Sequence, residues 1–472
     1  MIMKEFYDRE SEIKMLKEKA ESLKSGELVV MYGRRRVGKT EIVKRFLKDI
    51  KANKMYFYLD LVERPVALGA MSEAIKTQLG DTIELEDWDS FFEYLHKKSE
   101  KERLVVVIDE FQRFLEVSPE FITKLQRYWD ESLKYDKIMM LAVGSSIGMM
   151  LKISKSYAAP LYGRVDSRIK ISPFRYVDFR KMFSQMTEEE RIRYYAVFGG
   201  TPYYLTRAKD TEGDIYSRIH KLVLMPDGKL RDEAEILMEA ENLRTHAKYN
   251  SILQAISMGK ETTKEIEDYT RIKRTTLPTY LKNLEKLLDI VKKSEPVMGK
   301  ERHGRYRISD NFFRFWYKFV FPNQSLFNMA DGAGKVQDLI KDNLNAYIAK
   351  TFEKVVHELL MLYSGRVIKG IEIDFEQIGS WWDRKANEID ILAFSRKKVP
   401  VLLGEIKWTN NKVDVDLLDN LTKKTKLVNF KGEYKLMLVS KNGFTKRCIE
   451  KMDQMGCVYL DLADIEKLFD DV

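Results

Sequence analysis

Cysteine is nearly absent from this sequence. The 472 residues include two cysteines, Cys448 and Cys457. Two thiols cannot form the disulfide framework of a small secreted domain, and they are too few for a four-cysteine zinc site. The sequence therefore fits a reducing compartment and implies no structural metal.

Long apolar runs are missing as well. No stretch reaches the roughly 18 apolar residues of a membrane-spanning helix, and Met1–Glu10 is charged where a secretory signal would be apolar. We therefore expect a cytoplasmic protein with no membrane partner. Because 44% of the residues are hydrophobic, sizeable cores can form, and a chain of this length predicts about three domains.

Net charge is modest overall but uneven along the chain. Lys and Arg number 82 against 73 Asp and Glu, which gives +9, and six of these nine net positive charges lie within residues 251–320. Residues 321–472 carry equal numbers of acidic and basic side chains. A face that binds the phosphates of a nucleic acid is therefore expected within 251–320.

The first half of the chain alternates strand-like and helix-like segments. Strands are expected at residues 28–32, 55–61, 104–108 and 138–143, and helices at residues 10–25, 40–50, 90–98 and 119–134. Apolar strands of this kind belong in a parallel sheet covered on both faces. The fold class is therefore α/β, with a parallel-sheet core at 1–185 and a helical lid at 186–248.

A glycine-rich loop follows the first apolar strand and opens a helix. Its pattern, G-x-x-x-x-G-K-[ST], is typical of a phosphate-binding loop, in which backbone N–H groups and a lysine hold the phosphates. The residues expected to bind the phosphates are Gly33, Arg34, Arg35, Arg36, Val37, Gly38, Lys39 and Thr40. Thr40 would also supply its hydroxyl to Mg²⁺. A basic, glycine-bearing turn is the alternative interpretation.

An acidic pair ends the most apolar strand, as the second half of such a site requires. Asp109 would hold the Mg²⁺ shell, and Glu110 would orient and polarise the attacking water. Together with Lys39, these two residues are the expected catalytic groups. Ser145 and Ser146 follow the next apolar strand, where one hydroxyl could sense a γ-phosphate or simply belong to a turn.

Residues 249–321 have the order of a winged helix-turn-helix: three helical stretches, then two short strands joined by a loop. Basic residues cluster where the third helix begins and in the loop and strand that follow, and phosphate contacts from them would give affinity for DNA. The residues expected to contact nucleic acid are Arg271, Lys273, Arg274, Arg302 and Arg305. A protein-docking or lid element is the alternative.

After an expected linker at 322–344, the last α/β domain, residues 345–472, contains a second set of charged residues. Asp390 ends one strand, while Glu405 and Lys407 lie two residues apart on the next and so face the same side. Asp390 and Glu405 could bind Mg²⁺ or Mn²⁺, and Lys407 could activate water. Glu353, on an upstream helix, could point into the same catalytic site. An exposed Glu–Lys pair on a hairpin is the alternative.

The first half resembles the archaeal ATPase family, a branch of the P-loop NTPases related to AAA+ and STAND proteins. The matching segments are residues 6–10, 33–40, 104–110, 144–146, 161–164 and 199–204. This resemblance implies ATP as the nucleotide, with Arg9 and Pro202 near the adenine. It also makes Arg164 a candidate sensor of nucleotide state, against the alternative of a structural salt bridge.

The C-terminal domain resembles the PD-(D/E)XK, or restriction-endonuclease-like, superfamily, in the form that accompanies archaeal ATPases. Glu353, Asp390, Glu405 and Lys407 match its motif, whereas Ile389 stands where proline is usual. Taken together, the sequence predicts an ATP-hydrolysing protein that binds DNA through a winged helix and carries a metal-dependent nuclease-like domain, with ATP controlling access of DNA.

Two rival interpretations remain at this level. The first is an ATP-dependent regulatory switch that assembles into a homo-oligomer and uses a non-catalytic nuclease fold for binding. The second is a chaperone-like ATPase that acts on proteins.

Overall fold

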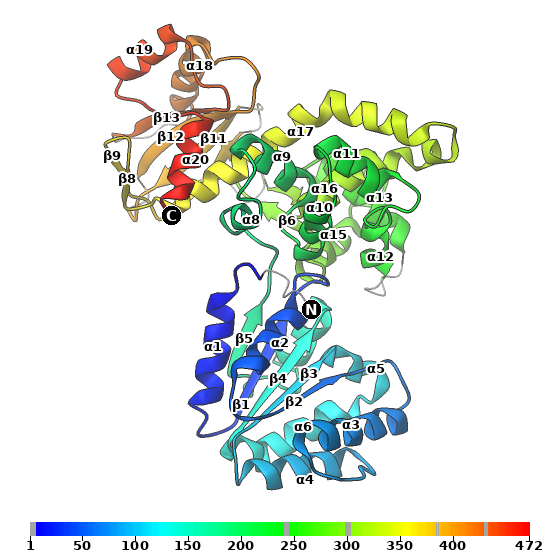
Figure 1. Ribbon diagram of the computed structural model, residues 1–472. Coiled ribbons are helices and arrows are strands. Elements are labelled where there is room, and N and C mark those ends of the chain that lie inside the picture. Colours follow the sequence, from blue (N-terminus) through cyan, green and yellow to red (C-terminus); the bar gives the residue numbers. More distant parts are fainter. Residues whose placement is uncertain are drawn as a thin grey trace. The chain divides into compact units, whose positions relative to one another are not determined.

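The computed structural model describes residues 6–155, 157–239, 245–297, 304–383, 385, 387–397, 399–428 and 433–472. The chain divides into two compact units (Figure 1). The first contains residues 1–173, 201–203 and 282–289, and the second contains 174–200, 204–281 and 290–472. The main segment of the first unit therefore ends before the residue 185 that the sequence suggested, and the expected lid belongs to the second unit except for residues 201–203.

The first unit is built on a five-stranded parallel sheet. Its strands are β1 (Glu27–Tyr32), β2 (Asn53–Tyr58), β3 (Leu104–Asp109), β4 (Ile138–Gly144) and β5 (Ser167–Lys170), in the order β2-β3-β4-β1-β5. All neighbouring pairs run parallel. The carboxyl ends of the adjacent strands β3, β4 and β1 consequently meet at one edge of the sheet.

Helices cover both faces of this sheet (Figure 1). They are α1 (Glu10–Glu21), α2 (Lys39–Asp49), α3 (Arg64–Leu79), α4 (Trp88–Ser99), α5 (Phe114–Val117), α6 (Glu120–Glu131) and α7 (Ile147–Ser154). One apolar core joins α1 and α2 to alternate strand residues such as Val29 and Val107. A second core joins α3, α4 and α6 to the residues between them, such as Val30 and Val106.

The sequence predicted four of the five strands of this unit, and most clearly β1, β3 and β4, because each of these is an almost uninterrupted apolar run. Strand β5 was missed, since Ile169 is the one buried residue among its four. Every residue of β3 and β4 is buried, as a sheet covered on both faces requires. Helix α3 was not predicted. Its apolar residues do not concentrate on one side, although Ala67, Leu68, Met71 and Ile75 are buried.

The second unit begins with helices. They are α8 (Tyr176–Met182), α9 (Glu188–Phe198), α10 (Pro202–Asp210), α11 (Ile215–Ile219), α12 (Glu233–Glu239), α13 (His246–Ser257), α14 (Thr263–Thr270), α15 (Leu277–Lys286) and α16 (Asn311–Phe315). Residues at the start of α10 and the end of α15 group with the first unit. Strands β6 (Val291–Ser294) and β7 (Arg305–Ile308) pair antiparallel after α15, so the expected order of three helices and a hairpin is present.

A single long helix replaces most of the expected linker. Helix α17 (Gly332–Leu362) is 31 residues long and buries apolar side chains along its length, among them Val336, Ile340 and Leu344. The polar and glycine-containing composition near its start led to the linker prediction, which was wrong. Apolar residues recur every three or four positions, and their burial stabilises the helix across this region.

The chain ends in a mixed sheet with the order β10-β11-β12-β13-β14. Its strands are β10 (Gln377–Trp382), β11 (Glu388–Phe394), β12 (Pro400–Lys407), β13 (Lys435–Ser440) and β14 (Val458–Leu460). A separate hairpin, β8 (Arg366–Ile368) with β9 (Ile371–Ile373), precedes this sheet. The helices of this region are α18 (Val415–Thr425), α19 (Lys446–Gln454) and α20 (Leu462–Asp470).

Strands β10, β11 and β12 pair antiparallel, whereas β12, β13 and β14 pair parallel. Within the described ranges, every helix is either too short or too polar to cross a lipid bilayer.

Candidate nucleotide site and C-terminal carboxylate cluster

The glycine-rich loop joins β1 to α2, as the sequence predicts. A Cβ atom at Gly33 would lie 2.2 Å from the carbonyl oxygen of Ile171, so only glycine fits there. Gly38 has a φ of +94°, in the left-handed region that glycine adopts without strain. The chain therefore turns sharply before α2, and the first N–H groups of that helix remain available to an anion.

Lys39 is buried over this loop. Its Nζ donates hydrogen bonds to the carbonyl oxygens of Gly33, at 2.8 Å, and Arg34, at 2.9 Å. The ammonium group therefore lies where phosphate oxygens could replace these carbonyls. Of the other loop arginines, Arg36 places its guanidinium 4.1 Å from the centre of the Tyr203 ring.

The Thr40 hydroxyl lies 2.9 Å from Oδ2 of Asp109 and donates a hydrogen bond to it. The Tyr56 hydroxyl donates to the same carboxylate oxygen, also at 2.9 Å. Burial, and then the Asp109 carboxylate, raise the pKa of Tyr56, so this phenol stays a donor at neutral pH. Hydroxyl and carboxylate oxygens are the hard ligands that Mg²⁺ prefers, so the donor set of Thr40 and Asp109 fits this ion.

Glu110 is fixed beside Asp109 by neighbouring donors. Its Oε2 accepts hydrogen bonds from Nε2 of Gln112, at 2.7 Å, and from Oγ of Ser145, at 2.9 Å. Glu110 also adopts a left-handed backbone, with a φ of 57°, which is uncommon for a residue other than glycine. Ser145, which the sequence offered as a γ-phosphate sensor, contacts the proposed water-orienting carboxylate.

Tyr56 and Gln112 were missed by the sequence interpretation. Gln112 is three residues beyond the apolar strand, and Tyr56 lies on β2, which pairs with β3. The pairing of Tyr58 with Asp109 in this register places Tyr56 two residues back on the same side of the sheet. Only strand order could have revealed this contact.

The remaining residues expected near the nucleotide belong to the same unit. Arg9 is buried, has a left-handed φ of 80°, and donates to the Glu12 carboxylate at 3.2 Å and to the carbonyl oxygen of Ser172. The Pro202 ring lies 4.0 Å from the position that a Gly38 Cβ would occupy. Pro202 is therefore next to the loop, whereas the adenine contact remains a prediction for both residues.

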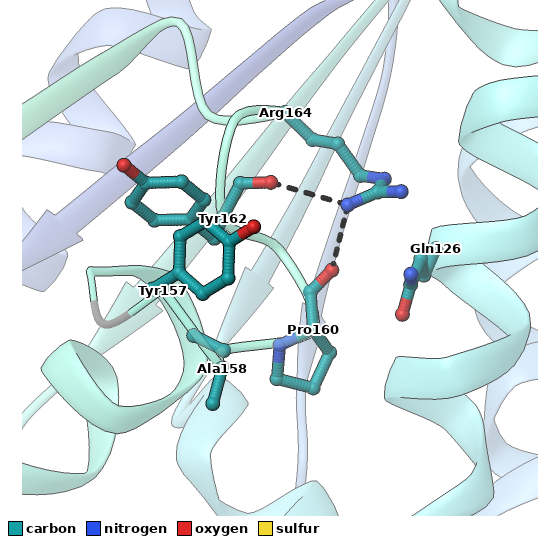
Figure 2. Close-up of a pocket in the computed structure, with 7 residues that line it drawn as sticks. Gln126, Tyr157, Ala158, Pro160, Tyr162 and Arg164 are labelled. Atoms are coloured by element: carbon teal, nitrogen blue, oxygen red, sulfur yellow. Dashed lines mark hydrogen bonds between the residues drawn. The ribbon is translucent and has the colours of Figure 1, made fainter.

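Arg164 forms a structural ion pair. Its Nε donates to Oδ1 of Asp130 at 2.9 Å, and its Nη1 donates to the carbonyl oxygens of Pro160 and Tyr162 (Figure 2). It borders a pocket of about 440 Å³ with Gln126 and Tyr157. The contacts of Arg164 favour the structural alternative over a sensing role within one chain.

The second group of expected residues gathers on β11 and β12. Strands β11 and β12 are antiparallel neighbours, and Oδ2 of Asp390 accepts a hydrogen bond from the backbone N–H of Ile406 at 2.9 Å. Lys407 Nζ lies 3.0 Å from Oε2 of Glu405 and 3.6 Å from Oδ2 of Asp390. Although burial opposes it, the two carboxylates raise the pKa of Lys407.

Glu353 faces this cluster from α17. Burial raises the pKa of its carboxyl group, and the Asp390 carboxylate raises it further, while Lys350 at 3.1 Å acts in the opposite direction. The structure thus brings Glu353, Asp390, Glu405 and Lys407 together, as the sequence predicts. We call these four residues the carboxylate cluster.

Two further side chains hold this cluster, and neither was predicted. Lys424 of α18 lies 2.6 Å from Oε1 of Glu405, so each oxygen of this carboxylate faces a lysine. His357 Nε2 lies 2.7 Å from the carbonyl oxygen of Asp390, and burial lowers the pKa of this imidazole. Lys424 is remote in sequence and lies on an ordinary amphipathic helix, so its role could not be recognised from its position.

The donor set of the carboxylate cluster is compatible with Mg²⁺. Among the described residues, no group of three or more His, Cys, Asp or Glu side chains is arranged to hold a metal. However, Mg²⁺ commonly binds through one or two carboxylates and completes its shell with water and substrate phosphates. Asp390 and Glu405 would be the ligands, and a bound ion would polarise a phosphoryl oxygen or lower the pKa of a bound water.

The basic residues around the third helix separate into two groups. Arg271, Lys273 and Arg274 are exposed in the segment between α14 and α15. Arg305 instead lies 2.9 Å from the Glu388 carboxylate and 4.6 Å from the centre of the Trp382 ring. Its guanidinium is therefore engaged within the second unit. Arg302 lies outside the described residues.

Comparison with known proteins agrees with the geometry of the first site. A family model described as an ATPase domain predominantly from Archaea matches residues 6–208. The uncharacterised protein MJECL04 of Methanocaldococcus jannaschii is 33% identical over 464 residues, which cover 97% of this chain and 99% of that protein. The chain belongs to the archaeal ATPase family.

A second model, described as archaeal and bacterial proteins of unknown function, matches residues 316–419 of this archaeal ATPase. Among solved structures, a Walker-type ATPase of Pyrococcus abyssi is similar, with 20% identity, a TM-score of 0.48, and coverage of 66% of this chain and 96% of that one. The ORC2 protein of Aeropyrum pernix, solved as ADPNP and ADP complexes, has 16% identity, a TM-score of 0.35, and coverage of 74% and 97%.

Replacing Glu110 tests the role of this carboxylate in the archaeal ATPase. In Glu110→Gln the amide oxygen can still accept a hydrogen bond from Ser145, but the group can no longer act as a base. We expect ATP hydrolysis to fall by about 10²–10⁴-fold while ATP binding persists. Steady-state phosphate release and equilibrium nucleotide titration measure the two quantities. The matched control is Glu116→Gln, an exposed glutamate on α5, which should behave as wild type. Undiminished hydrolysis in Glu110→Gln would remove Glu110 from the mechanism.

Proposed function

We propose that this archaeal ATPase hydrolyses ATP in the first unit and binds duplex DNA through the second. The observation that carries the first part is the convergence of Lys39, Thr40, Asp109 and Glu110 at one edge of a parallel sheet. When bound, MgATP supplies the phosphoanhydride that is hydrolysed and the cation that neutralises its charge.

Each residue of this site has a distinct part in the proposal. The Gly33–Gly38 backbone and the Lys39 ammonium orient the phosphates, Thr40 and Asp109 hold the cation, and Glu110 orients water. The hydrogen bonds from Gln112 and Ser145 keep the Glu110 carboxylate in one position. Such positioning supplies most of what phosphoryl transfer requires from a protein.

DNA binding is proposed for residues 249–321, which we interpret as a winged helix. Three helices precede the β6–β7 hairpin, and Arg271, Lys273 and Arg274 are exposed in the segment that leads into the third, α15. The N-terminal end of a recognition helix is the part that meets the duplex, and these three residues lie directly before that end. Since Arg305 is ion-paired with Glu388, we leave it out of the proposed surface. Assembly into a homo-oligomer stays a prediction.

Removing the three exposed charges tests the DNA proposal. In the triple variant Arg271→Gln, Lys273→Gln, Arg274→Gln, we expect weaker binding to duplex DNA of any sequence, because phosphate contacts carry no sequence information. The salt dependence should also weaken, with the slope of log K against log salt falling by about one for each lost contact. Fluorescence anisotropy of a labelled duplex across a salt series measures both.

A control with the same loss of charge replaces three exposed lysines of the first unit, namely Lys97, Lys101 and Lys137. This control should bind DNA as wild type does. Equal affinity and an equal salt slope in the Arg271, Lys273, Arg274 variant would contradict the proposed surface.

Metal-dependent cleavage of DNA is a second candidate function, favoured by the carboxylate cluster. Because Glu353, Asp390 and Glu405 gather around Lys407, a cation and a scissile phosphate could be held together there. The rival is a binding-only fold, which is favoured by the lysine at each oxygen of Glu405. A cation would have to displace one of these ammonium groups.

Cleavage assays with Mg²⁺ or Mn²⁺ distinguish the two interpretations. We expect cleavage by the wild type to require the cation and to fall by at least about 10²-fold in Glu405→Gln, which removes a metal ligand. The control is Glu450→Gln, on α19. Linear, branched and supercoiled DNA should be compared with and without ATP. Cleavage that persists in Glu405→Gln would place the activity elsewhere, and no cleavage of any substrate would favour the binding-only fold.

A further inference from the structure

A group of four basic side chains lies where the β6–β7 hairpin, α16 and α17 come together within the second unit. We call Lys292, Arg307, Arg314 and Lys354 the cationic cluster. Lys292 and Arg307 are directly opposite each other in the antiparallel register of the hairpin, so they share one face. Like charges in such a cross-strand pair destabilise a hairpin unless an anion or another compensation is present.

Arg307 has an unused hydrogen-bond donor. Its Nε donates to Glu261 at 3.2 Å. Its Nη2 is shielded from solvent and has no hydrogen-bond partner among the described residues, since the Glu388 carboxylate lies 3.7 Å away. A shielded guanidinium N–H without a partner is costly, and it is a donor that an anion could use.

The α17 side of the group is also cationic. Arg314 donates from Nη2 to the Thr351 hydroxyl at 2.6 Å, and Lys354 lies almost one turn further along the same helix. Within the part of the chain that the structure describes, the Lys354 ammonium group makes no hydrogen bond and no ion pair. Burial, followed by the positive charges of Arg314, Arg307 and Lys292, lowers the pKa of Lys354 to about 7.

The nearby carboxylates are already engaged. Glu261 pairs with Arg307 and Arg305, Glu388 pairs with Arg305, Lys350 and, at 3.7 Å, Arg307, and Glu353 pairs with Lys350. The Asp310 carboxylate accepts a hydrogen bond from the N–H of Phe313 and so caps α16. The four basic side chains of the cationic cluster therefore carry more positive charge than the nearby carboxylates neutralise. A bound anion would balance this excess.

We propose that the cationic cluster binds a phosphoryl group, either the phosphate of a small molecule or that of a nucleic-acid strand. Guanidinium forks and an ammonium group match the oxygens of a tetrahedral phosphate, each giving charge-assisted hydrogen bonds. Arg307 supplies its unused N–H and Lys354 supplies its unpaired ammonium. This phosphate site is separate from the Gly33–Thr40 loop and does not depend on the surface proposed for duplex DNA.

The test uses the full chain carrying Lys39→Ala, so that the glycine-rich loop contributes little to phosphate binding. Inorganic phosphate and a short single-stranded oligonucleotide are titrated separately by calorimetry at constant ionic strength. We expect Lys354→Gln to weaken binding by about tenfold or more, the equivalent of one charge-assisted hydrogen bond. Lys354→Arg, which keeps the charge, should retain most of the affinity.

Two further variants guard against a trivial loss of folding. Lys292→Gln changes an exposed lysine that should not affect the core, and it should also weaken binding. Lys341→Gln, an exposed lysine elsewhere on α17, should have no effect.

The two probes distinguish the source of the phosphate. Binding of inorganic phosphate that depends on Lys354 and Lys292 supports a small-molecule phosphate. Binding of the oligonucleotide alone with the same dependence supports a nucleic-acid strand. If neither probe binds, or if Lys354→Gln and Lys292→Gln bind as well as the Lys341→Gln control, the proposal is overturned. Failure of the duplex experiment would leave these titrations unaffected, because they use different residues and different probes.

Discussion

The hydrogen bond between the Thr40 hydroxyl and the Asp109 carboxylate, 2.9 Å long, is the contact on which the nucleotide site depends. It ties the first turn of α2 to the end of β3, although 69 positions separate the two residues in sequence. The parallel sheet makes this contact possible because β1, β4 and β3 are consecutive and end at the same edge. The backbone N–H of Gly33 also donates to the carbonyl oxygen of Gly144 at 3.3 Å, which fixes the loop to the end of β4.

In the second unit, ion pairs and hydrogen bonds to buried charged side chains hold separate helices together. Glu188 is buried and accepts hydrogen bonds from the Tyr176 hydroxyl, Arg180 and Arg191. Arg180 also reaches Asp470 of α20 at 2.9 Å, which links this helix to α8 and α9. Buried ions of this kind are tolerated only when each has partners.

Helix α17 links several of the charged groups of the second unit. The Glu358 carboxylate accepts hydrogen bonds from the backbone N–H groups of Tyr176 and Val177, at 3.0 and 2.8 Å, and so binds the start of α8. One to two turns earlier on the same helix, Glu353 belongs to the carboxylate cluster and Lys350 pairs with it. The 31 residues of α17 thus combine a structural contact, part of a candidate active site and, at Lys354, part of the cationic cluster.

The sequence predicted features that are local or repeat with a fixed period. The phosphate-binding pattern needs only eight neighbouring residues, and the alternation on a strand places Glu405 and Lys407 on one face. The start of α17 was predicted as a linker because glycine and polar residues are frequent there. The apolar residues that recur along the whole helix were given too little weight.

Contacts between distant segments could not be predicted. Lys424 is 19 residues from Glu405, and Arg305 is 83 residues from Glu388. Nothing in the sequence near Lys424 or Arg305 specifies these partners. The contacts depend on how the strands and helices pack. The cationic cluster is a further case, because its four members come from four separate elements of the second unit.

The most direct test of the account is ATP turnover by Lys39→Ala. The Lys39 ammonium stands over the phosphate-binding loop, so its loss should lower turnover by at least about 10²-fold, the usual cost of removing one charge-stabilising donor. The control is Lys44→Ala, an exposed lysine of the same helix, and circular dichroism should show both variants folded. Turnover in Lys39→Ala equal to that of the wild type would contradict the nucleotide site.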